Sequence, residues 1–243
     1  MNLEGKGAVV TGASRGLGAA VARQLAAHGA KVVLVARGEA ALEEVAAGIR
    51  ATGGTAHALA DDVGDKRAIH RISALAAEAV GRVELLVHNA SELGPTPLKP
   101  LLDTDCEDLE RVLAVNLLGP FRLTKAVMGP ALLAGTGMVV QVTSDASVQP
   151  YPGWGAYGVS KAALDHLGRI WAEETRALGL TFLTVDPGEM DTRMHADAMP
   201  DADRASLAQP DAVGRRLVEL IRAQAPPPSG TRLELAGWVG GAR

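Results

Sequence analysis

Three features of the sequence predict a single α/β domain with the Rossmann fold, a doubly wound, mostly parallel sheet of seven strands with helices on both faces. Short apolar runs alternate with longer helical patterns, as they do where crossover helices join parallel strands. A glycine-rich turn follows the first apolar run. The chain has 243 residues, of which 47% are hydrophobic, and this suits one large core better than two small ones. We therefore expect residues 1–243 to form one domain.

The seven expected strands are short apolar runs bounded by glycine or polar residues. They are residues 7–11, 32–36, 55–60, 84–88, 138–143, 181–185 and 232–235. The connections after the first five strands are long enough for helices, and right-handed crossovers are expected.

Two of the predicted helical segments are apolar on more than one side. The segment 105–133 carries the apolar residues Leu109, Val112, Leu113, Val115, Leu117, Leu118, Phe121, Leu123 and Val127. The helix predicted over 156–178 has a second apolar face with Ala163, Leu167 and Ile170. Since the sheet can cover only one side of each helix, we predict that a second subunit covers the other side.

Charge and hydropathy exclude some classes of partner. The net charge is −4, the isoelectric point is about 5.9, and the chain has no run of lysine or arginine. We therefore predict no binding to nucleic acid or to anionic lipid. No uninterrupted apolar stretch is long enough for a membrane span, so none is predicted.

The single cysteine carries no predicted chemistry. Cys106 cannot form an internal disulfide, and the neighbouring charges of Asp105 and Glu107 disfavour its thiolate. The first residues lack the apolar core of a signal peptide, so we expect a cytoplasmic protein. We predict no metal site.

The glycine-rich turn is a candidate phosphate site. Its glycines, Gly12, Gly16 and Gly18, have the spacing G-x-x-x-G-x-G between a predicted strand and a predicted helix. Such a turn brings backbone N–H groups close to a pyrophosphate, and the start of the helix adds about half a positive charge. An ordinary strand-to-helix turn is the alternative. The expected contacts to the phosphates are Gly12, Ser14, Arg15, Gly16, Leu17 and Gly18.

A second pattern lies in the other half of the chain. Tyr157 and Lys161 are one helical turn apart, so the ammonium is expected near the phenol, and Ser144 lies thirteen residues before the tyrosine. Alone, the tyrosine and lysine could be an ordinary amphipathic pair. Their order after the glycine turn favours carbonyl chemistry on a nicotinamide cofactor.

With these motifs in this order, the sequence resembles the short-chain dehydrogenase/reductase family over nearly its whole length. The resemblance implies an NADP(H)- or NAD(H)-dependent oxidoreductase that interconverts a carbonyl and an alcohol. It also implies a homodimer or homotetramer, because family members commonly associate through the two helical segments described above. The stretch 235–241 matches the family's final glycine motif only loosely.

The residue after the second predicted strand indicates which cofactor is bound. NAD-selective sites usually place a carboxylate there to accept a hydrogen bond from the ribose 2′-OH. Here Ala36 is followed by Arg37, and the guanidinium groups of Arg37 and Arg15 suit a 2′-phosphate. We therefore favour NADP(H) over NAD(H), although either arginine alone could be a surface charge.

The resemblance implies further contacts to the cofactor. Asp62 would accept from the adenine amino group and the Val63 backbone would contact the ring. Asn89 and Ala90 would line the ribose, in a stretch that reads His-Asn-Ala-Ser where the family usually has Asn-Asn-Ala-Gly. The loop with Pro187, Gly188, Met190 and Thr192 would hold the nicotinamide carboxamide, and its leading residue is Asp186 where the family usually has asparagine. Tyr157 and Lys161 would also contact the cofactor.

Carbonyl reduction needs a proton donor as well as a hydride. Tyr157 is the predicted acid. To act as base near pH 7 its pKa must fall by roughly three units, and one nearby ammonium, that of Lys161, is marginal for this. Ser144 is predicted to donate to the substrate oxygen. Asn116 matches a family residue that holds a water in a proton relay, and a purely structural asparagine is an equal alternative.

The predicted substrate walls are mostly apolar and aromatic, so a neutral or apolar carbonyl compound is favoured over a charged acid. They are Leu93, Val148, Gln149, Tyr151, Trp154, Met190, Met194 and His195. A 3-oxoacyl thioester reductase is one alternative. A non-catalytic, NADP-binding redox sensor is another, and a Rossmann methyltransferase a weaker third.

Overall fold

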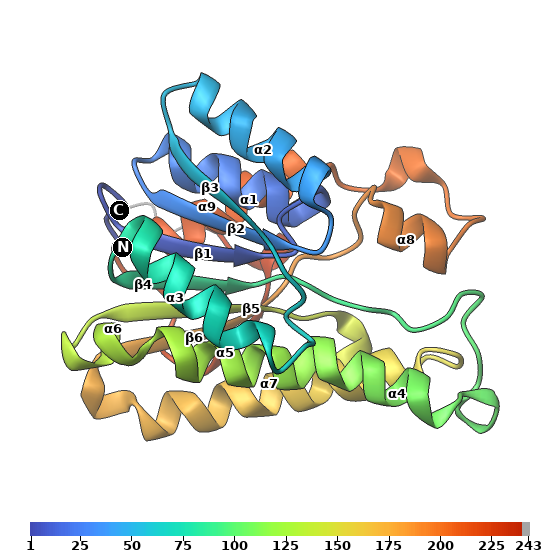
Figure 1. Ribbon diagram of the computed structural model, residues 1–243. Helices are drawn as coiled ribbons and strands as arrows, with labels where there is room; N and C mark the ends of the chain where they lie inside the picture. The colour runs from blue at the N-terminus through green and yellow to red at the C-terminus, as the bar shows by residue number, and fades with distance from the viewer. Residues whose placement is uncertain (240–243) are drawn as a thin grey trace.

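Seven strands form one central sheet with helices on both faces in the computed structural model, which describes residues 1–239 (Figure 1). The strands are β1 (Gly7–Thr11), β2 (Lys31–Ala36), β3 (Thr55–Ala60), β4 (Val83–His88), β5 (Gly137–Val142), β6 (Leu180–Asp186) and β7 (Thr231–Glu234). Their order is β3-β2-β1-β4-β5-β6-β7, and all neighbouring pairs are parallel. The predicted fold class is confirmed. Gly240 and Gly241, which end the loosely matched C-terminal motif, lie outside the described residues.

Alternate residues of the strands build two separate cores. Val10 and Leu34 pack with α1 (Gly16–Ala27), α2 (Glu39–Ala51) and α9 (Pro210–Arg222) on one face. Val9 and Leu86 pack on the other face, because successive side chains of a strand point to opposite sides. That face is covered by helices that include α3 (Ala68–Val80), α5 (Gly119–Val127), α6 (Gly129–Leu133) and α7 (Gly155–Glu174). Both faces of the sheet are therefore buried, as expected for parallel strands.

The apolar segment predicted over 105–133 is not one regular helix. It consists of α4 (Cys106–Leu113), a π-helical turn (Ala114–Leu118), α5 and α6. The helix predicted over 156–178 ends earlier, at Glu174, and a short 3₁₀ turn follows. Apolar side chains from both segments are left exposed: Leu118, Phe121, Val159 and Ile170.

The order of the strands determines where a cleft can form. The chain passes from β1 to β2 on one side of the sheet's centre and from β4 to β5 on the other side. At such a reversal of strand order a crevice opens at the carboxyl ends of the strands. In Figure 1 these ends point towards the side where α8 (Arg193–Ala198) and the segment before α4 project, opposite the two termini. No helix among residues 1–239 has the length and apolar content that a membrane span requires.

Candidate active site

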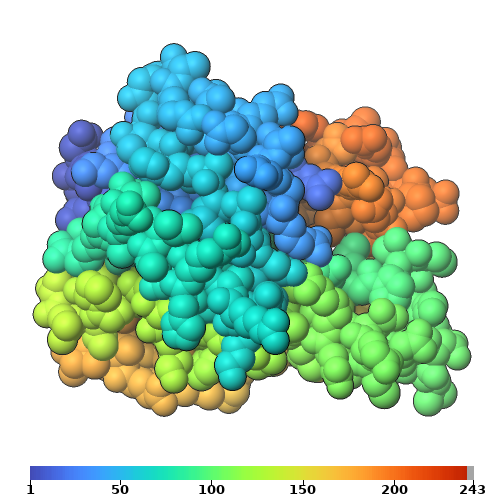
Figure 2. Space-filling view, viewed as in Figure 1, coloured from blue at the N-terminus to red at the C-terminus, as the bar shows by residue number. Residues whose placement is uncertain are grey.

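One cleft of about 1370 Å³ runs along the carboxyl ends of the strands. Figure 2 shows the surface hollowed between the green segment that leads into α4 and the orange segment around α8. The glycine turn lines the cleft after β1, and Ser144, Tyr157 and Lys161 line it two strands further along the sheet, around the end of β5. The structure therefore brings the two predicted motifs together in one cavity.

The glycine turn leaves no room for side chains at two of its positions. Gly12 has a φ of +67°, and a Cβ there would lie 2.8 Å from the Cα of Ala90. A Cβ on Gly18 would lie 2.3 Å from the main-chain oxygen of Gly12. At Gly16 the nearest atom to an added Cβ is Cγ2 of Thr192, 3.4 Å away, so this position faces the loop across the cleft. The turn is thus closely packed behind and open towards the cleft.

The start of α1 is free to bind an anion. No side chain caps this helix, and its first turn has no acidic residue, so its first N–H groups are not taken up by side chains. Ser14 and Arg15 line the cleft beside it, and Leu17 also lines it although its side chain is largely buried. This fits a pyrophosphate, which the N–H groups and the helix dipole would hold.

Asn89 and Ala90 support the turn from the neighbouring strand. Asn89 Nδ2 donates to the main-chain oxygens of Thr11 and Gly12, at 3.0 and 3.2 Å. The main-chain N–H groups of Asn89 and Ala90 both donate to Thr11 Oγ1, each at 3.0 Å. These bonds join the ends of β1 and β4, and both residues also line the cleft.

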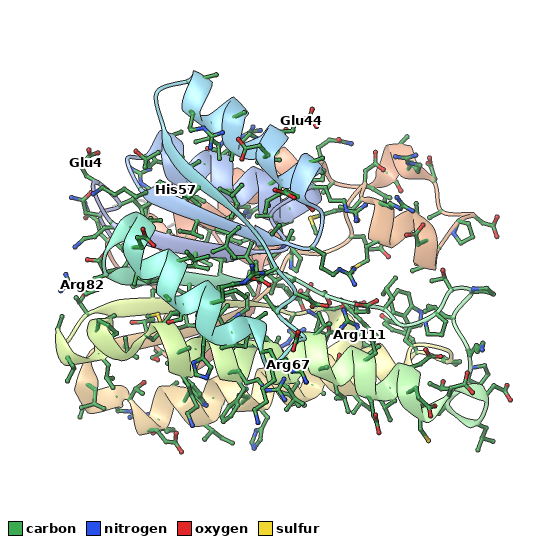
Figure 3. All side chains as sticks on the ribbon, viewed as in Figure 1. Glu4, Glu44, His57, Arg67, Arg82 and Arg111 are labelled. Carbon is green, nitrogen blue, oxygen red and sulfur yellow. The ribbon has the colours of Figure 1, made fainter. Side chains whose placement is uncertain are left out.

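The arginine predicted to select the cofactor belongs to a charged network. Arg37 Nη1 lies 3.4 Å from Glu92 Oε2, and Arg111 Nη2 donates both to Glu92 Oε2 (3.3 Å) and to Asp62 Oδ2 (2.9 Å). Figure 3 labels Arg111, which α4 holds beside the end of β3. Asp62 Oδ1 accepts from Gly64 N at 2.8 Å. Both Asp62 oxygens thus have protein partners, and its contact to adenine stays a prediction, as does that of Val63, which also lines the cleft.

The loop after β6 forms the opposite wall. Asp186 Oδ1 accepts from Gly188 N at 3.0 Å, which closes the turn that carries Pro187. Thr192 Oγ1 accepts from His195 N at 3.2 Å and so caps α8. Pro187, Gly188, Met190 and Thr192 all line the cleft, and their contacts to a cofactor stay a prediction.

Ser144, Tyr157 and Lys161 converge where β5 meets α7. Tyr157 is 7% exposed and Lys161 is 2% exposed. Lys161 Nζ lies 5.5 Å from the centroid of the Tyr157 ring and donates to the main-chain oxygen of Val142 at 2.8 Å. The ammonium therefore packs against the phenol ring, as the helical spacing predicts.

The pKa values of this pair follow from their burial. Burial raises the pKa of Tyr157 to about 12, although hydrogen bonding to Ser144 and Ser91 lowers it. Burial lowers the pKa of Lys161 to about 8, against the raising effect of Asp165 and Asp186. Desolvation of the phenolate is the largest effect on the pKa of Tyr157, in line with the expectation that the charge of Lys161 alone is marginal for lowering it.

Asn116 has partners for its whole side chain. Its Oδ1 accepts from Glu92 N at 2.8 Å and from Ser91 Oγ at 3.3 Å. Its Nδ2 donates to the Glu92 oxygen and to Ser160 Oγ, both at 2.9 Å. The π-helical turn thus places Asn116 where its side chain links the loop after β4 to α7 by hydrogen bonds. This favours a purely structural role for the Asn116 side chain over a role in a proton relay.

A carboxylate that the sequence reasoning missed lies next to Ser144. Asp145 Oδ1 accepts from Ser144 Oγ at 2.9 Å, and Asp145 Oδ2 accepts from the hydroxyl of Tyr151 at 2.8 Å. Asp145 and Glu189 line the cleft together with the predicted walls Leu93, Tyr151, Trp154, Met190, Met194 and His195. Val148 and Gln149 are not among the lining residues, so that part of the prediction is wrong: Val148 is 58% exposed, because the 3₁₀ turn after Ser144 carries it outwards.

His88 has a structural environment. It is 3% exposed, and its Nε2 lies 2.8 Å from Thr124 Oγ1. Burial, and then the charge of Lys161, lower the pKa of His88 to about 3, so the imidazole stays neutral.

Sequence reasoning also missed Glu92, Arg111 and Arg232, whose charges meet other parts of the site only after folding. The one available signal was local: Arg232 is a lone cation within the final predicted strand. Among residues 1–239, no three His, Cys, Asp or Glu side chains converge in a way that could hold a metal ion.

Comparison with known proteins gives matches over most of the chain. The family model for short chain dehydrogenases matches residues 6–203. A short chain dehydrogenase of Pseudocercospora fijiensis is 36% identical over 212 residues, which are 85% of this chain and 67% of that protein. The 3-oxoacyl-acyl-carrier-protein reductase FabG of Escherichia coli is 33% identical over 215 residues, 88% of this chain and 85% of that protein.

Two solved structures are similar over 96% of this chain. One is described as a short chain dehydrogenase from Pseudomonas syringae and has a TM-score of 0.89 at 33% identity, over 96% of its own chain. The other is a metagenomic short-chain oxidoreductase in complex with NADP, with a TM-score of 0.81 at 31% identity over 99% of its chain.

Proposed function

Since the chain belongs to the short-chain dehydrogenase/reductase family, we propose that it is an NADP(H)-dependent enzyme which interconverts a carbonyl and a secondary alcohol. The observation that carries the proposal is that both groups of residues line the same cleft. This cleft has an open helix N-terminus with a glycine turn at one end, and a buried phenol, ammonium and serine hydroxyl at the other. A purely nucleotide-binding protein has no need of the second group.

The choice of NADP(H) rests on cations at the nucleotide end. Arg15 and Arg37 both line the cleft there and are exposed, and Ala36 stands where an NAD-selective site has a carboxylate. The solved neighbour in complex with NADP supports the same choice. Glu92 lies near Arg37 at 3.4 Å, a weak pairing that a 2′-phosphate could displace.

Each residue of the catalytic end has a distinct role in reduction. The bound cofactor supplies a hydride to the carbonyl carbon. Tyr157 donates its proton to the developing alkoxide, and a pKa of about 12 keeps the phenol protonated at neutral pH. Ser144 must turn its hydroxyl from Asp145 towards the substrate oxygen in order to donate to it. Lys161 stabilises the phenolate that remains.

The cleft favours a neutral or apolar substrate. Leu93, Trp154 and Met194 supply apolar lining at the catalytic end. Asp145 and Glu189 line the same region, and their charges would repel a carboxylate or phosphate on the substrate. This adds a reason to disfavour charged acids beyond the apolar walls that the sequence predicts.

A 3-oxoacyl thioester reductase is the second candidate. It is favoured by the similarity to FabG, which extends over 85% of that protein. A thioester substrate is also a ketone, so the same three side chains would serve.

We further propose a cytoplasmic homodimer or homotetramer. Leu118 and Phe121 on one segment, and Val159 and Ile170 on α7, are each more than a third exposed. A second copy that covers these side chains would remove apolar area from water.

The test is the oxidation of NADPH against a panel of ketones, aldehydes, quinones and acyl thioesters, with NADH as the comparison. We expect turnover with at least one neutral ketone or aldehyde, and a preference for NADPH. Activity that requires an acyl thioester would select the second candidate. Tight binding of NADPH without turnover of any compound would instead indicate a redox sensor.

A further inference from the structure

An arginine of the last strand joins the two carboxylates behind the catalytic end. Arg232 Nε donates to Asp165 Oδ2 at 3.0 Å, and its Nη2 donates to Asp186 Oδ2 at 3.1 Å. The same Nη2 donates to the main-chain oxygen of Ser144 at 3.1 Å. The Asp165 and Asp186 side chains are 3% and 7% exposed, and that of Arg232 is 19% exposed. One largely buried guanidinium thus links the carboxyl ends of β5 and β6 to the middle of α7.

Each of the three acceptors is next to a residue of the proposed reaction. Ser144 is itself the proposed donor to the substrate oxygen. Asp165 follows Lys161 by one helical turn, and it also accepts from Ser147 Oγ at 2.7 Å. Asp186 begins the loop of residues 187–192 that lines the cleft, and its Oδ1 accepts from Gly188 N in the first turn of that loop.

The two carboxylates depend on this arginine. Asp165 Oδ1 is buried and has no hydrogen-bond partner among the described residues. The hydrogen bonds to Asp165 Oδ2 must therefore offset the cost of burying the whole carboxylate. The charges of both carboxylates also act on Lys161, since they raise the pKa of its ammonium against the larger lowering effect of burial. Removing one partner of a buried ion pair is strongly destabilising. The positions of Asp165, Asp186 and Arg232 are therefore coupled.

We infer that Arg232 is a positioning residue: its guanidinium fixes the Ser144 main chain, the Lys161 helix and the loop that begins at Asp186 relative to one another. Asp186, in the place of the family's usual asparagine, gives this contact its charge. A lysine in place of Arg232 keeps the charge but cannot span three acceptors in different directions, because its donors share one nitrogen.

The experiment compares Arg232→Lys with the matched variant Arg82→Lys. Arg82 also donates through Nε and Nη2 to a buried carboxylate, that of Glu84, at 3.2 and 2.9 Å. Figure 3 labels Arg82 at the opposite edge of the molecule from the cleft. Both variants therefore remove a guanidinium that pairs with a buried carboxylate, but only Arg232→Lys changes a contact of the candidate active site.

The first readout does not depend on any reaction. Amide hydrogen exchange in the unliganded protein is measured over residues 144–148 and 186–192. We expect Arg232→Lys to speed exchange in both segments by about tenfold, the effect of one lost charged hydrogen bond, and Arg82→Lys to leave them unchanged. Equal exchange in the two variants would overturn the inference.

The second readout concerns the cofactor and the reaction. We expect Arg232→Lys to weaken NADP⁺ binding about fivefold and to lower kcat about tenfold, with the KM for the carbonyl compound within about twofold of the parent value. Arg82→Lys should change none of these beyond about twofold. A purely stabilising role for Arg232 would lower the melting temperature and leave kcat per folded molecule unchanged, which would contradict the inference.

A second variant covers the case in which Arg232→Lys does not fold. Asp186→Asn keeps the arginine and removes the charge of one acceptor, and we expect faster exchange in 186–192 by about threefold. Where both single variants fold, their effects on kcat should be non-additive by about threefold or more in the double variant. No change in Asp186→Asn, or strict additivity, would count against the inference.

The catalytic part of this inference rests on the proposed function, and the two can fail separately. A parent protein without turnover on the whole panel would remove the proposed function, while the exchange measurement would still decide the role of Arg232. An active parent with equal exchange in Arg232→Lys and Arg82→Lys would remove the inference alone.

Discussion

The two ends of the cleft are lined by different kinds of chemical groups. The nucleotide end consists of main chain and small residues, where Gly12, Gly18 and Asn89 lie within van der Waals or hydrogen-bond distance of one another. The catalytic end consists of buried ionisable side chains, including Lys161 and Tyr157. The first end is stabilised by close packing, whereas the second costs stability, because charged or titratable groups are removed from water.

The strongest test of this contrast is Lys161→Met. We expect kcat to fall by about 10²- to 10⁴-fold, since the phenolate loses its cation. We also expect the free energy of unfolding at pH 7 to rise by about 1–2 kcal/mol, because burial destabilises the Lys161 ammonium more than Asp165 and Asp186 stabilise it. Urea denaturation measures the second effect, and a loss of stability in the variant would contradict the account.

The pH dependence of the unfolding free energy tests the same contribution of Lys161 to stability. Burial lowers the folded-state pKa of Lys161 from its ordinary value of 10.5 to about 8. Between these values the unfolded chain binds more protons, so the Lys161 contribution makes the parent protein more stable as pH rises through this window. The stability difference between Lys161→Met and the parent should therefore narrow from pH 8 to pH 10.5.

Gly18→Ala tests the packed end. The new Cβ would lie 2.3 Å from the Gly12 oxygen, and we expect a loss of about 3 kcal/mol of stability together with loss of NADP⁺ binding. The matched control is Gly48→Ala in α2, where nothing lies within 4 Å of an added Cβ. That change should raise stability by about 0.5–1 kcal/mol, since alanine is the better helix former. Thermal unfolding of both variants decides the point.

The cations at the nucleotide end should act on affinity alone. Arg15→Gln and Arg37→Gln should each weaken NADP⁺ binding about tenfold and leave NAD⁺ binding within about twofold. Arg67→Gln is the control, because this exposed arginine is not among the residues that line the cleft. Titration calorimetry with both cofactors measures the difference. Equal losses for NADP⁺ and NAD⁺ would show that the 2′-phosphate is not what these arginines bind.

The smallest expected effect is at the substrate opening. Glu189 is 67% exposed, so its charge is strongly screened. Glu189→Gln should raise kcat/KM for an anionic ketone by about twofold to threefold at low salt, without change for a neutral ketone. Absence of any salt-dependent difference would mean that this carboxylate does not shape substrate choice.

The same contrast explains how far the sequence could predict the protein. The nucleotide end is encoded within one short stretch, so the spacing of Gly12, Gly16 and Gly18 predicts both the turn and its place after β1. The strands were predicted to within a residue or so at each end, because buried parallel strands are continuous apolar runs. The helical spacing of Tyr157 and Lys161 is likewise a local signal.

The charged contacts of the cleft could not be predicted in this way. Arg111 meets Asp62 across 49 residues, and Arg232 meets Ser144 across 88 residues. No periodicity in the sequence relates such partners. The pKa of Tyr157 was also missed, because a spacing of four residues indicates proximity to Lys161 but not how deeply both groups are buried.

The most direct test of the proposed function is Tyr157→Phe, which removes one buried hydroxyl and keeps the ring against Trp154 and Lys161. Steady-state reduction of a carbonyl compound that the parent enzyme accepts is measured together with the dissociation constant for NADPH. The account predicts a fall in kcat of about 10²- to 10⁴-fold, with NADPH affinity and melting temperature close to those of the parent. Undiminished turnover in this variant would contradict the assignment of Tyr157 as the proton donor, and with it the proposed mechanism.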